Sequence, residues 1–399
     1  MQLKKVLKYI LGNLPQLFLC CFVFFAPFNI STVFYTTSSL SSGFFSPYLS
    51  VNIYLADMCF LFSMLLFAPR LIKLFACQTF QRSFVVLLGL ALLSVLVSSN
   101  YPVVVFYFLR LLGFLFFVFM VRFGFVKKKL LILAFISSVS LLAFLGILQF
   151  IFQSGLGLSF FGEPNIAADS LSTAKFSFSN VVFLRPYSLT LHPNILAGFS
   201  LVGFFVTFQS GVIKNEKLKY LLSAVLLSAL VLSFSRSATL ALLISLLCVF
   251  GVKSRLKYVM FFLLILFVSS FFIIERSGIS ERFELLVIAR EMFFSAPFLG
   301  VGAGNFTAAM QDFTVNKLLP WEFQPVHNIY LLVLCEMGIV GLLCLILFLW
   351  SLFKKLGRHS FPIASLLSLL IIGLFDHYLF TLFPGQFLFS FVVALVVSK

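Results

Sequence analysis

The strongest constraint on this chain is a series of long apolar runs separated by short, basic segments. Hydrophobic residues make up 62% of the chain and charged residues only 10%, whereas an average soluble domain carries roughly 25% charged residues. No water-soluble fold of this length could bury so much apolar surface, so the solvent must be lipid. A membrane-spanning helix needs about 17 to 25 residues, and about twelve runs approach that length. They lie near residues 14–34, 51–68, 83–99, 102–121, 129–152, 188–208, 218–234, 237–251, 257–274, 327–353, 360–375 and 378–397.

These runs predict an all-α integral membrane protein, a single polytopic domain over residues 1–399 with about twelve transmembrane helices. If the N-terminus lies in the cytoplasm, 20 of the 28 lysines and arginines fall on the cytoplasmic side and seven on the outer side. Such an excess of basic residues is the normal orientation signal of membrane helices. It also accounts for the net charge of +16, so we expect a lipid bilayer and no nucleic acid as partner.

Two long loops are predicted on the outer side, at about residues 153–187 and 275–326. The second contains ISERFELLVIAREMFF, Ile279 to Phe294, whose large apolar residues fall mostly opposite several charges. This pattern predicts a helix lying in the outer membrane interface. The glycines of the following SAPFLGVGAGNF have no predicted strand before them, so they indicate a close turn rather than a nucleotide site. The seven cysteines show no CxxC spacing, which argues against a zinc site or a disulfide framework.

Two polar stretches near the outer face contain arginines. In LRPYSLTLHPN, Arg185 and His192 precede Pro193, which is well placed as the first residue of a membrane helix. In LSFSRSATL, Arg236 interrupts an otherwise apolar run. An arginine near the membrane usually faces a polar cavity. The alternative for both residues is simple anchoring to lipid headgroups.

Two further stretches contain histidines. His327 and Asn328 lie at the outer mouth of a predicted helix, and Glu336 lies nine residues, or about 13 Å, deeper. We expect Glu336 to be a structural partner rather than a catalytic group. His327 is placed where water and an amphiphile could both reach it, and its ordinary pKa range suits a general base. The pair Asp376–His377 is either a histidine oriented by a carboxylate or a polar turn between two helices.

In their order, these stretches resemble the O-antigen ligase and O-antigen polymerase superfamily of bacterial surface-polysaccharide enzymes. The family pattern places an Arg before a His-Pro-Asn helix start, a Ser-Arg between two helices, a long outer loop with a glycine turn, and a His-Asn helix start. The resemblance covers about residues 180–345. The matching stretches are RPYSLTLHPN, SFSRSA, RFELLVIAREMFFSAPFLGVGAGNF and HNIYLLVLCEMGIVG.

The resemblance implies a metal-independent glycosyltransferase of the cytoplasmic membrane, with its active site facing outward and no cofactor. Its donor would be a polyprenyl-diphosphate-linked glycan, and its acceptor a hydroxyl of a glycan, lipid or protein. By motif, Arg185 and Arg236 hold the donor diphosphate, Arg282 makes a weaker contact with it, and His327 helps to activate the acceptor. Arginine suits this role because its fork matches phosphate geometry and remains charged. Other polar residues of these stretches are expected to support the site: His192, Asn194, Asn328, Asp376 and His377.

Two alternatives remain open at this point. The superfamily includes ligases, which load a glycan onto another molecule, and polymerases, which extend a glycan on its own carrier. A transporter or flippase of a lipid-linked saccharide would also have about twelve helices. It would more often place ionisable residues at the membrane midplane and break its helices in paired positions. Here the polar stretches gather at one face, which favours an enzyme.

Overall fold

The computed structural model describes residues 2–36, 46–75, 89, 92, 101–167, 173–178, 181–250, 279–315, 318–319, 322–356 and 362–398. The predicted spans at 83–99 and 257–274 lie essentially outside these residues. Within the described part there are thirteen α-helices and four strands. The helices are α1 (Gln2–Phe25), α2 (Leu55–Phe75), α4 (Tyr101–Arg122), α5 (Lys128–Phe152), α6 (Pro193–Gln209), α7 (Glu216–Leu232), α8 (Arg236–Phe250), α10 (Ile279–Ser295), α11 (Phe306–Ala309), α12 (Ile329–Phe353), α13 (Pro362–Ile372), α14 (Tyr378–Thr381) and α15 (Phe383–Val397). The strands are β1 (Ser31–Thr36), β2 (Ser50–Tyr54), β3 (Lys175–Phe178) and β4 (Val181–Leu184).

The apolar helices confirm the membrane class of the fold. Three of them, α4, α5 and α12, are long and apolar enough to cross a membrane, and shorter apolar helices include α6, α8, α13 and α15. Helix α15 is buried along nearly its whole length. A helix that is hydrophobic on all sides belongs in the centre of a bundle, and α15 packs against α4 and α13 there. The protein is thus a mostly helical membrane protein.

Aromatic side chains hold the centre of this bundle together. The Phe135 and Phe391 rings stack with their centroids 4.2 Å apart, which joins α5 to α15. Phe22 of α1 meets Phe387 edge to face at 5.3 Å. Such pairs contribute about 0.5 to 1.5 kcal/mol each beyond the area they bury. The many phenylalanines of the sequence therefore serve packing between helices as well as contact with lipid.

The prediction of a purely α-helical chain is wrong, because the structure contains two β-hairpins. Strand β1 (31–36) includes residues 31–34, which were assigned to the end of the first span. Residues 50–54 form β2, so the second span begins at Leu55 rather than at 51. The two strands pair antiparallel, from Ser31 opposite Tyr54 to Thr36 opposite Ser50. The segment STVFYT is rich in β-branched and aromatic residues, which favour strands, yet it is apolar enough to extend a hydropathy run. The second hairpin, β3–β4, lies in the first predicted outer loop.

The last predicted span is also divided. Residues 378–397 form two helices, α14 and α15, because Leu382 is extended and Pro384 stands at the start of α15. Proline lacks the N–H that a continuous helix would need, but it fits the first turn of a new helix. The break leaves the short helix α14 next to His377, which precedes it directly.

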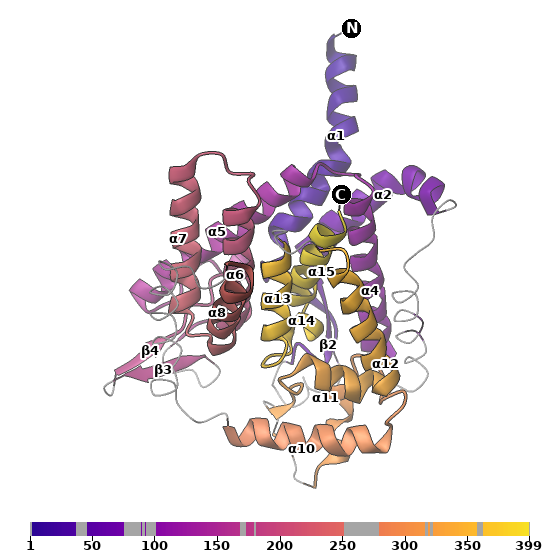
Figure 1. The fold of residues 1–399 in the computed structure, drawn as a ribbon, viewed down its shortest axis with the longest axis vertical. Coiled ribbons are helices and arrows are strands. Elements are labelled where there is room, and N and C mark those ends of the chain that lie inside the picture. Colours follow the sequence, from indigo (N-terminus) through magenta and orange to yellow (C-terminus); the bar gives the residue numbers. More distant parts are fainter. Residues whose placement is uncertain are drawn as a thin grey trace.

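Helix α10 confirms the predicted helix of the second outer loop and runs across the end of the bundle opposite the N-terminus (Figure 1). The helix has two apolar sides. Ile288, Ala289 and Met292 are buried against the neighbouring segments, while Phe283 and Phe294 are exposed, which leaves large apolar side chains available to the predicted membrane interface. The hairpin β3–β4 lies toward the same end of the bundle (Figure 1).

Candidate functional site

Arg185 connects three separate parts of the chain. It follows β4, and its Nε donates to the Ser233 carbonyl oxygen at 2.7 Å, at the end of α7. Its Nη2 donates to Asn194 Oδ1 at 2.7 Å, in the first turn of α6. Asn194 Nδ2 in turn donates to Asp376 Oδ2 at 2.8 Å, in the turn after α13. The structure therefore brings together Arg185, Asn194 and Asp376, all predicted site residues.

The segment carrying Arg185 is held by two residues that the sequence interpretation missed. Gln149 Oε1, on α5, accepts the backbone N–H groups of Tyr187 and Ser188 at 3.0 and 2.5 Å. The Gln149 Nε2 group donates to Glu163 Oε1 at 2.6 Å. A glutamine inside a long apolar run is the signal that could have pointed to this role, because a buried amide needs partners.

His192 begins α6. Its Nδ1 accepts the backbone N–H of Asn194 at 3.1 Å, and Pro193 occupies the first helical position as predicted. Burial, together with the nearby charge of Arg185, lowers the pKa of His192 to about 3. His192 is therefore neutral at physiological pH, and its proton lies on Nε2 because Nδ1 is an acceptor.

His377 and His327 lie against each other, with ring centroids 4.9 Å apart at an angle of 71°. His377 Nδ1 lies 2.9 Å from the Thr381 hydroxyl. Burial lowers the pKa of His377 to about 3 and also lowers the pKa of His327. Both rings are therefore neutral at physiological pH, as a base that accepts a proton must be.

Asp376 ties the segments together. Its Oδ2 accepts from Asn194, and its Oδ1 accepts from the backbone N–H of His377 at 2.8 Å. Although burial favours its neutral form, the surrounding His377, His327 and His192, with the Asn194 hydrogen bond, hold the pKa of Asp376 below its usual value. Of the two readings of Asp376–His377, the described contacts favour a structural turn, because the His377 ring faces Thr381.

Asn328 caps the start of α12, directly after His327. The Asn328 Oδ1 atom caps the helix by accepting the N–H groups of Tyr330 and Leu331, both at 2.9 Å, and its Nδ2 donates to the Leu374 carbonyl oxygen at 3.1 Å. These bonds fix the position of His327. Among the described residues, buried His327 Nδ1 has no hydrogen-bond partner. A buried polar atom without a partner is unusual.

Arg236 and Arg282 come from different elements but act on the same region. Arg236 is the first residue of α8, just after the turn that contains Ser233. Arg282 is exposed in the first turn of α10. Burial, with the charges of both arginines, lowers the pKa of Arg185 to about 10. The charge of Arg282 also lowers the pKa of His327. The three arginines thus lie within electrostatic reach of one another, Arg282 also acts on His327, and Arg185 remains protonated at physiological pH.

The glycine turn and Glu336 form a separate structural unit on α12. Glu336 Oε2 accepts the Gly304 N–H at 2.8 Å, and Oε1 accepts the Phe306 N–H at 3.1 Å. Helix α12 is interrupted at Gly338, where φ is 65° and a Cβ atom would collide with the backbone of Phe298. These contacts agree with a structural role for Glu336 and with the predicted close turn.

Together, the fold and this arrangement define a helical membrane protein with a polar site of arginines and neutral histidines at one end of its bundle. Residues 221–346 match the O-Antigen ligase family. The resemblance is thereby confirmed over this segment, which contains Arg236, Arg282, His327 and Asn328. The remaining predicted site residues lie outside it: Arg185, His192, Asn194, Asp376 and His377. No curated protein matches the chain. Within the described ranges, no three His, Cys, Asp or Glu side chains are grouped so as to hold a metal ion.

Proposed function

We propose that the protein is a membrane glycosyltransferase of the O-antigen ligase type, which moves a glycan from a polyprenyl diphosphate such as undecaprenyl diphosphate onto an acceptor hydroxyl. The observation that carries the proposal is the hydrogen-bonded link from Arg185 through Asn194 to Asp376, next to the paired rings of His327 and His377. The charges of Arg236 and Arg282 act on Arg185, and that of Arg282 acts on His327 as well. The family match over residues 221–346 supports it. In this account the enzyme serves assembly of the cell envelope, including lipopolysaccharide or a related surface polysaccharide.

The chemistry follows from the charges. The acceptor oxygen attacks the anomeric carbon of the donor sugar, and the bond between that carbon and the diphosphate oxygen breaks with its electron pair on the diphosphate. His327 takes the proton of the attacking hydroxyl, and the proton then leaves with the diphosphate or water. The arginines stabilise the charge that develops on the leaving group, which is worth most at a partly buried site. Arginine can do this in two-point contact with phosphate oxygens. This route needs no metal ion.

The same proposal includes the orientation. We place the N-terminus in the cytoplasm, about twelve helices in the cytoplasmic membrane, and the site at the outer face. In a cysteine-free background, single cysteines replacing exposed Val181 and Val315 should react with an impermeant reagent on intact spheroplasts. A cysteine at Asn215, the cap of α7, should not. Reaction at position 215 alone would reverse the orientation.

A transporter of a lipid-linked saccharide remains the second candidate, because α12 is interrupted at Gly338 and residues 378–397 are divided at Leu382. Broken helices often form transport sites. In this protein, however, the break at Gly338 accommodates the backbone of Phe298, and Glu336 is bonded to Gly304 and Phe306. These contacts favour a structural role for the interruption in α12, in which it positions the outer-loop segment from Phe298 to Phe306.

Glycan analysis of a deletion strain tests the proposal. A ligase predicts long glycan chains that accumulate unattached on their carrier, whereas a polymerase predicts single repeat units. The gene should restore the wild-type pattern, and its Arg185→Ala variant should not, although it reaches the membrane in equal amount. If lipid-linked glycan instead accumulates on the cytoplasmic side, the transporter is the better account.

A further inference from the structure

A polar cavity of about 60 Å³ lies beside the histidines. It is lined by Thr381, whose hydroxyl contacts His377, and by Tyr48, whose ring packs edge-on against the His377 ring at 5.3 Å. Pro325, two residues before His327, lines it as well. The cavity therefore borders the segments that hold the two histidine rings.

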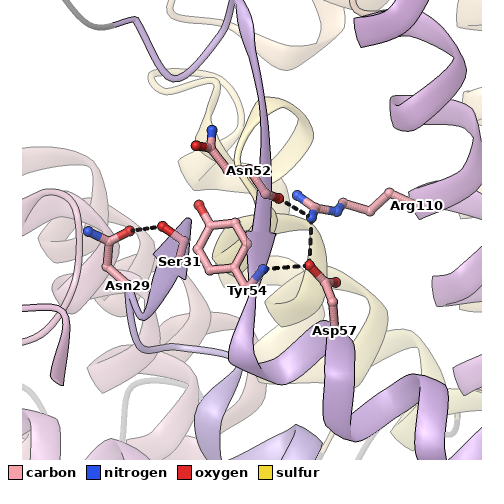
Figure 2. Close-up of polar contacts among 6 residues, drawn as sticks. All are labelled: Asn29, Ser31, Asn52, Tyr54, Asp57 and Arg110. Carbon is pink, nitrogen blue, oxygen red and sulfur yellow. Dashed lines mark hydrogen bonds and ion pairs between the residues drawn. The ribbon is translucent and has the colours of Figure 1, made fainter. Parts of the chain in front are cut away.

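One wall of this cavity is Arg110, the arginine that falls inside a predicted span. Its Nη2 donates to the Asn52 carbonyl oxygen and to Asp57 Oδ2, both at 2.8 Å (Figure 2). Its guanidinium carbon lies 4.5 Å from the ring centre of Phe106 and 4.6 Å from that of Phe383. These contacts use only Nη2 for hydrogen bonding, and a guanidinium carries three further N–H donors on Nη1 and Nε. Arg110 is thus a fixed donor whose charge is balanced by Asp57.

Another wall carries an acceptor. Gln386 is only 5% exposed, and its Nε2 donates to the Phe380 carbonyl oxygen at 2.6 Å. Its Oε1 is buried and has no hydrogen-bond partner among the described residues. The Thr307 side chain also lines the cavity. The cavity therefore combines guanidinium donors, an unpartnered amide oxygen and hydroxyl groups with aromatic surface.

This mixture fits a ligand that both donates and accepts hydrogen bonds and has an apolar face. A water molecule needs roughly 10 to 15 Å³, so about 60 Å³ has room for about four hydroxyl-sized groups. Hydroxyl groups of a sugar ring can both donate to Gln386 Oε1 and accept from Arg110. A diphosphate fits less well here, because Asp57 already balances the charge of Arg110.

We propose that this cavity is the acceptor subsite, which holds the hydroxylated edge of an acceptor sugar ring so that a neighbouring hydroxyl faces His327. The inference rests on the proposed glycosyltransferase function. It assigns the two polar regions to the two substrates: the diphosphate of the donor to Arg185, Arg236 and Arg282, and the acceptor sugar to Arg110 and Gln386.

The test uses the full-length protein in lipid nanodiscs. The donor is the lipid-linked glycan extracted from the source strain, and the acceptor is the unmodified acceptor fraction from the envelope of its deletion strain. Gln386→Met keeps the side-chain length but removes the amide. It should raise the acceptor KM at least about fivefold, as expected for the loss of one buried hydrogen bond. The donor KM should stay within about twofold of wild type.

Two controls make the result decisive. Thr307→Val changes only a hydroxyl of the cavity wall and should also raise the acceptor KM, so it replaces Gln386→Met if that variant does not fold. Ser368→Ala loses a buried hydrogen bond to Ser245 and is not part of the cavity lining, so both KM values should be unchanged.

A binding measurement separates this inference from the proposed function. Without donor, the acceptor fraction should raise the Tm of the wild type but not that of Gln386→Met. Equal acceptor KM values and equal Tm shifts for wild type and both cavity variants would overturn the acceptor subsite while transfer activity stands. If the wild type shows no transfer with any donor, the proposed function fails, and the subsite fails with it.

Discussion

Two arginines in this protein lie close to the membrane but have different partners. Arg110 forms an ion pair with Asp57 at 2.8 Å and is enclosed by aromatic rings. Arg185 is hydrogen-bonded to neutral oxygens, the Ser233 carbonyl and the Asn194 amide. Its nearest link to a carboxylate runs through Asn194 to Asp376. The charge of Arg110 is thus balanced by an adjacent carboxylate, whereas the hydrogen bonds of Arg185 fix its orientation without neutralising its charge.

The difference teaches how the two regions can serve different ligands. An arginine balanced by an adjacent carboxylate has little net attraction for an anion, but it can still donate hydrogen bonds to a neutral hydroxyl. An arginine held by neutral acceptors keeps its geometry fixed and its charge available for a diphosphate. The neighbouring charges of Arg236 and Arg282, which lower the pKa of Arg185, would be compensated when a diphosphate binds.

The largest expected effect is on catalysis at Arg185. Arg185→Ala should lower kcat/KM at least about 100-fold, as for the loss of a group that stabilises transition-state charge. Arg185→Lys should recover little of it, because a point charge does not reproduce two-point contact with phosphate. The measurement is transfer from labelled donor by purified protein.

The matched control for this experiment is Arg290→Ala. Arg290 lies on α10 with a side chain that is 70% exposed, so its removal should leave transfer within about twofold of wild type. Full activity of Arg185→Lys would show that Arg185 acts only as a general lipid anchor.

The next effect is on stability at Arg110. Arg110→Met should destabilise the protein by about 2 to 4 kcal/mol, because it leaves Asp57 in a mostly buried position without its counter-ion. We discount the full cost of a buried pair because the Asp57 side chain is 27% exposed. The double variant Arg110→Met, Asp57→Leu should recover most of the loss. The measurement is the denaturation midpoint in detergent, and equal midpoints for wild type and Arg110→Met would contradict the structural role.

A smaller effect concerns pH. Burial lowers the pKa values of His192, His327 and His377 below the ordinary value of about 6.5. Below pH 6.5 the unfolded chain therefore binds protons that the folded site does not, so stability should fall as the pH is lowered from there. Asp376, whose pKa is also lowered, acts in the same direction at lower pH: its stabilising contribution is complete above about pH 3.8 and is lost as the pH falls below that value.

The same shift predicts the activity profile. Because His327, the proposed general base, stays neutral below its ordinary pKa, the acid limb of kcat/KM should lie below pH 6.5. Suppose the acid limb of the wild type lies at or above pH 6.5, and the His327→Ala variant retains enough activity to show the same limb. His327 would then not be the base.

Much of the fold follows from local sequence patterns. The helices α4 and α5 begin and end within one residue of the runs predicted at 102–121 and 129–152. The hairpin β1–β2 was missed because STVFYT is apolar, so hydropathy alone extends the helix, while its strand pairing depends on Ser50–Tyr54, further along the chain. Pro27, just after the end of α1, was the available local signal.

The site was predictable in its residue types but not in its connections. Arg185, His192 and Asn194 share a short stretch, so their proximity could be inferred. Asn194 and Asp376 are 182 positions apart, and no spacing rule joins them. Arg110 and Asp57 could have been paired in advance, because ionisable residues in apolar runs usually find each other.

The most direct test of the account is transfer by purified protein in nanodiscs with lipid-linked donor, acceptor and excess EDTA. The account predicts that glycan moves to the acceptor without added metal, and that transfer is lost in both Arg185→Ala and His327→Ala. If chelation stops transfer and Mg²⁺ or Mn²⁺ restores it, the arginine-based mechanism is wrong. Undiminished transfer by the His327→Ala variant would likewise contradict the assignment of that histidine.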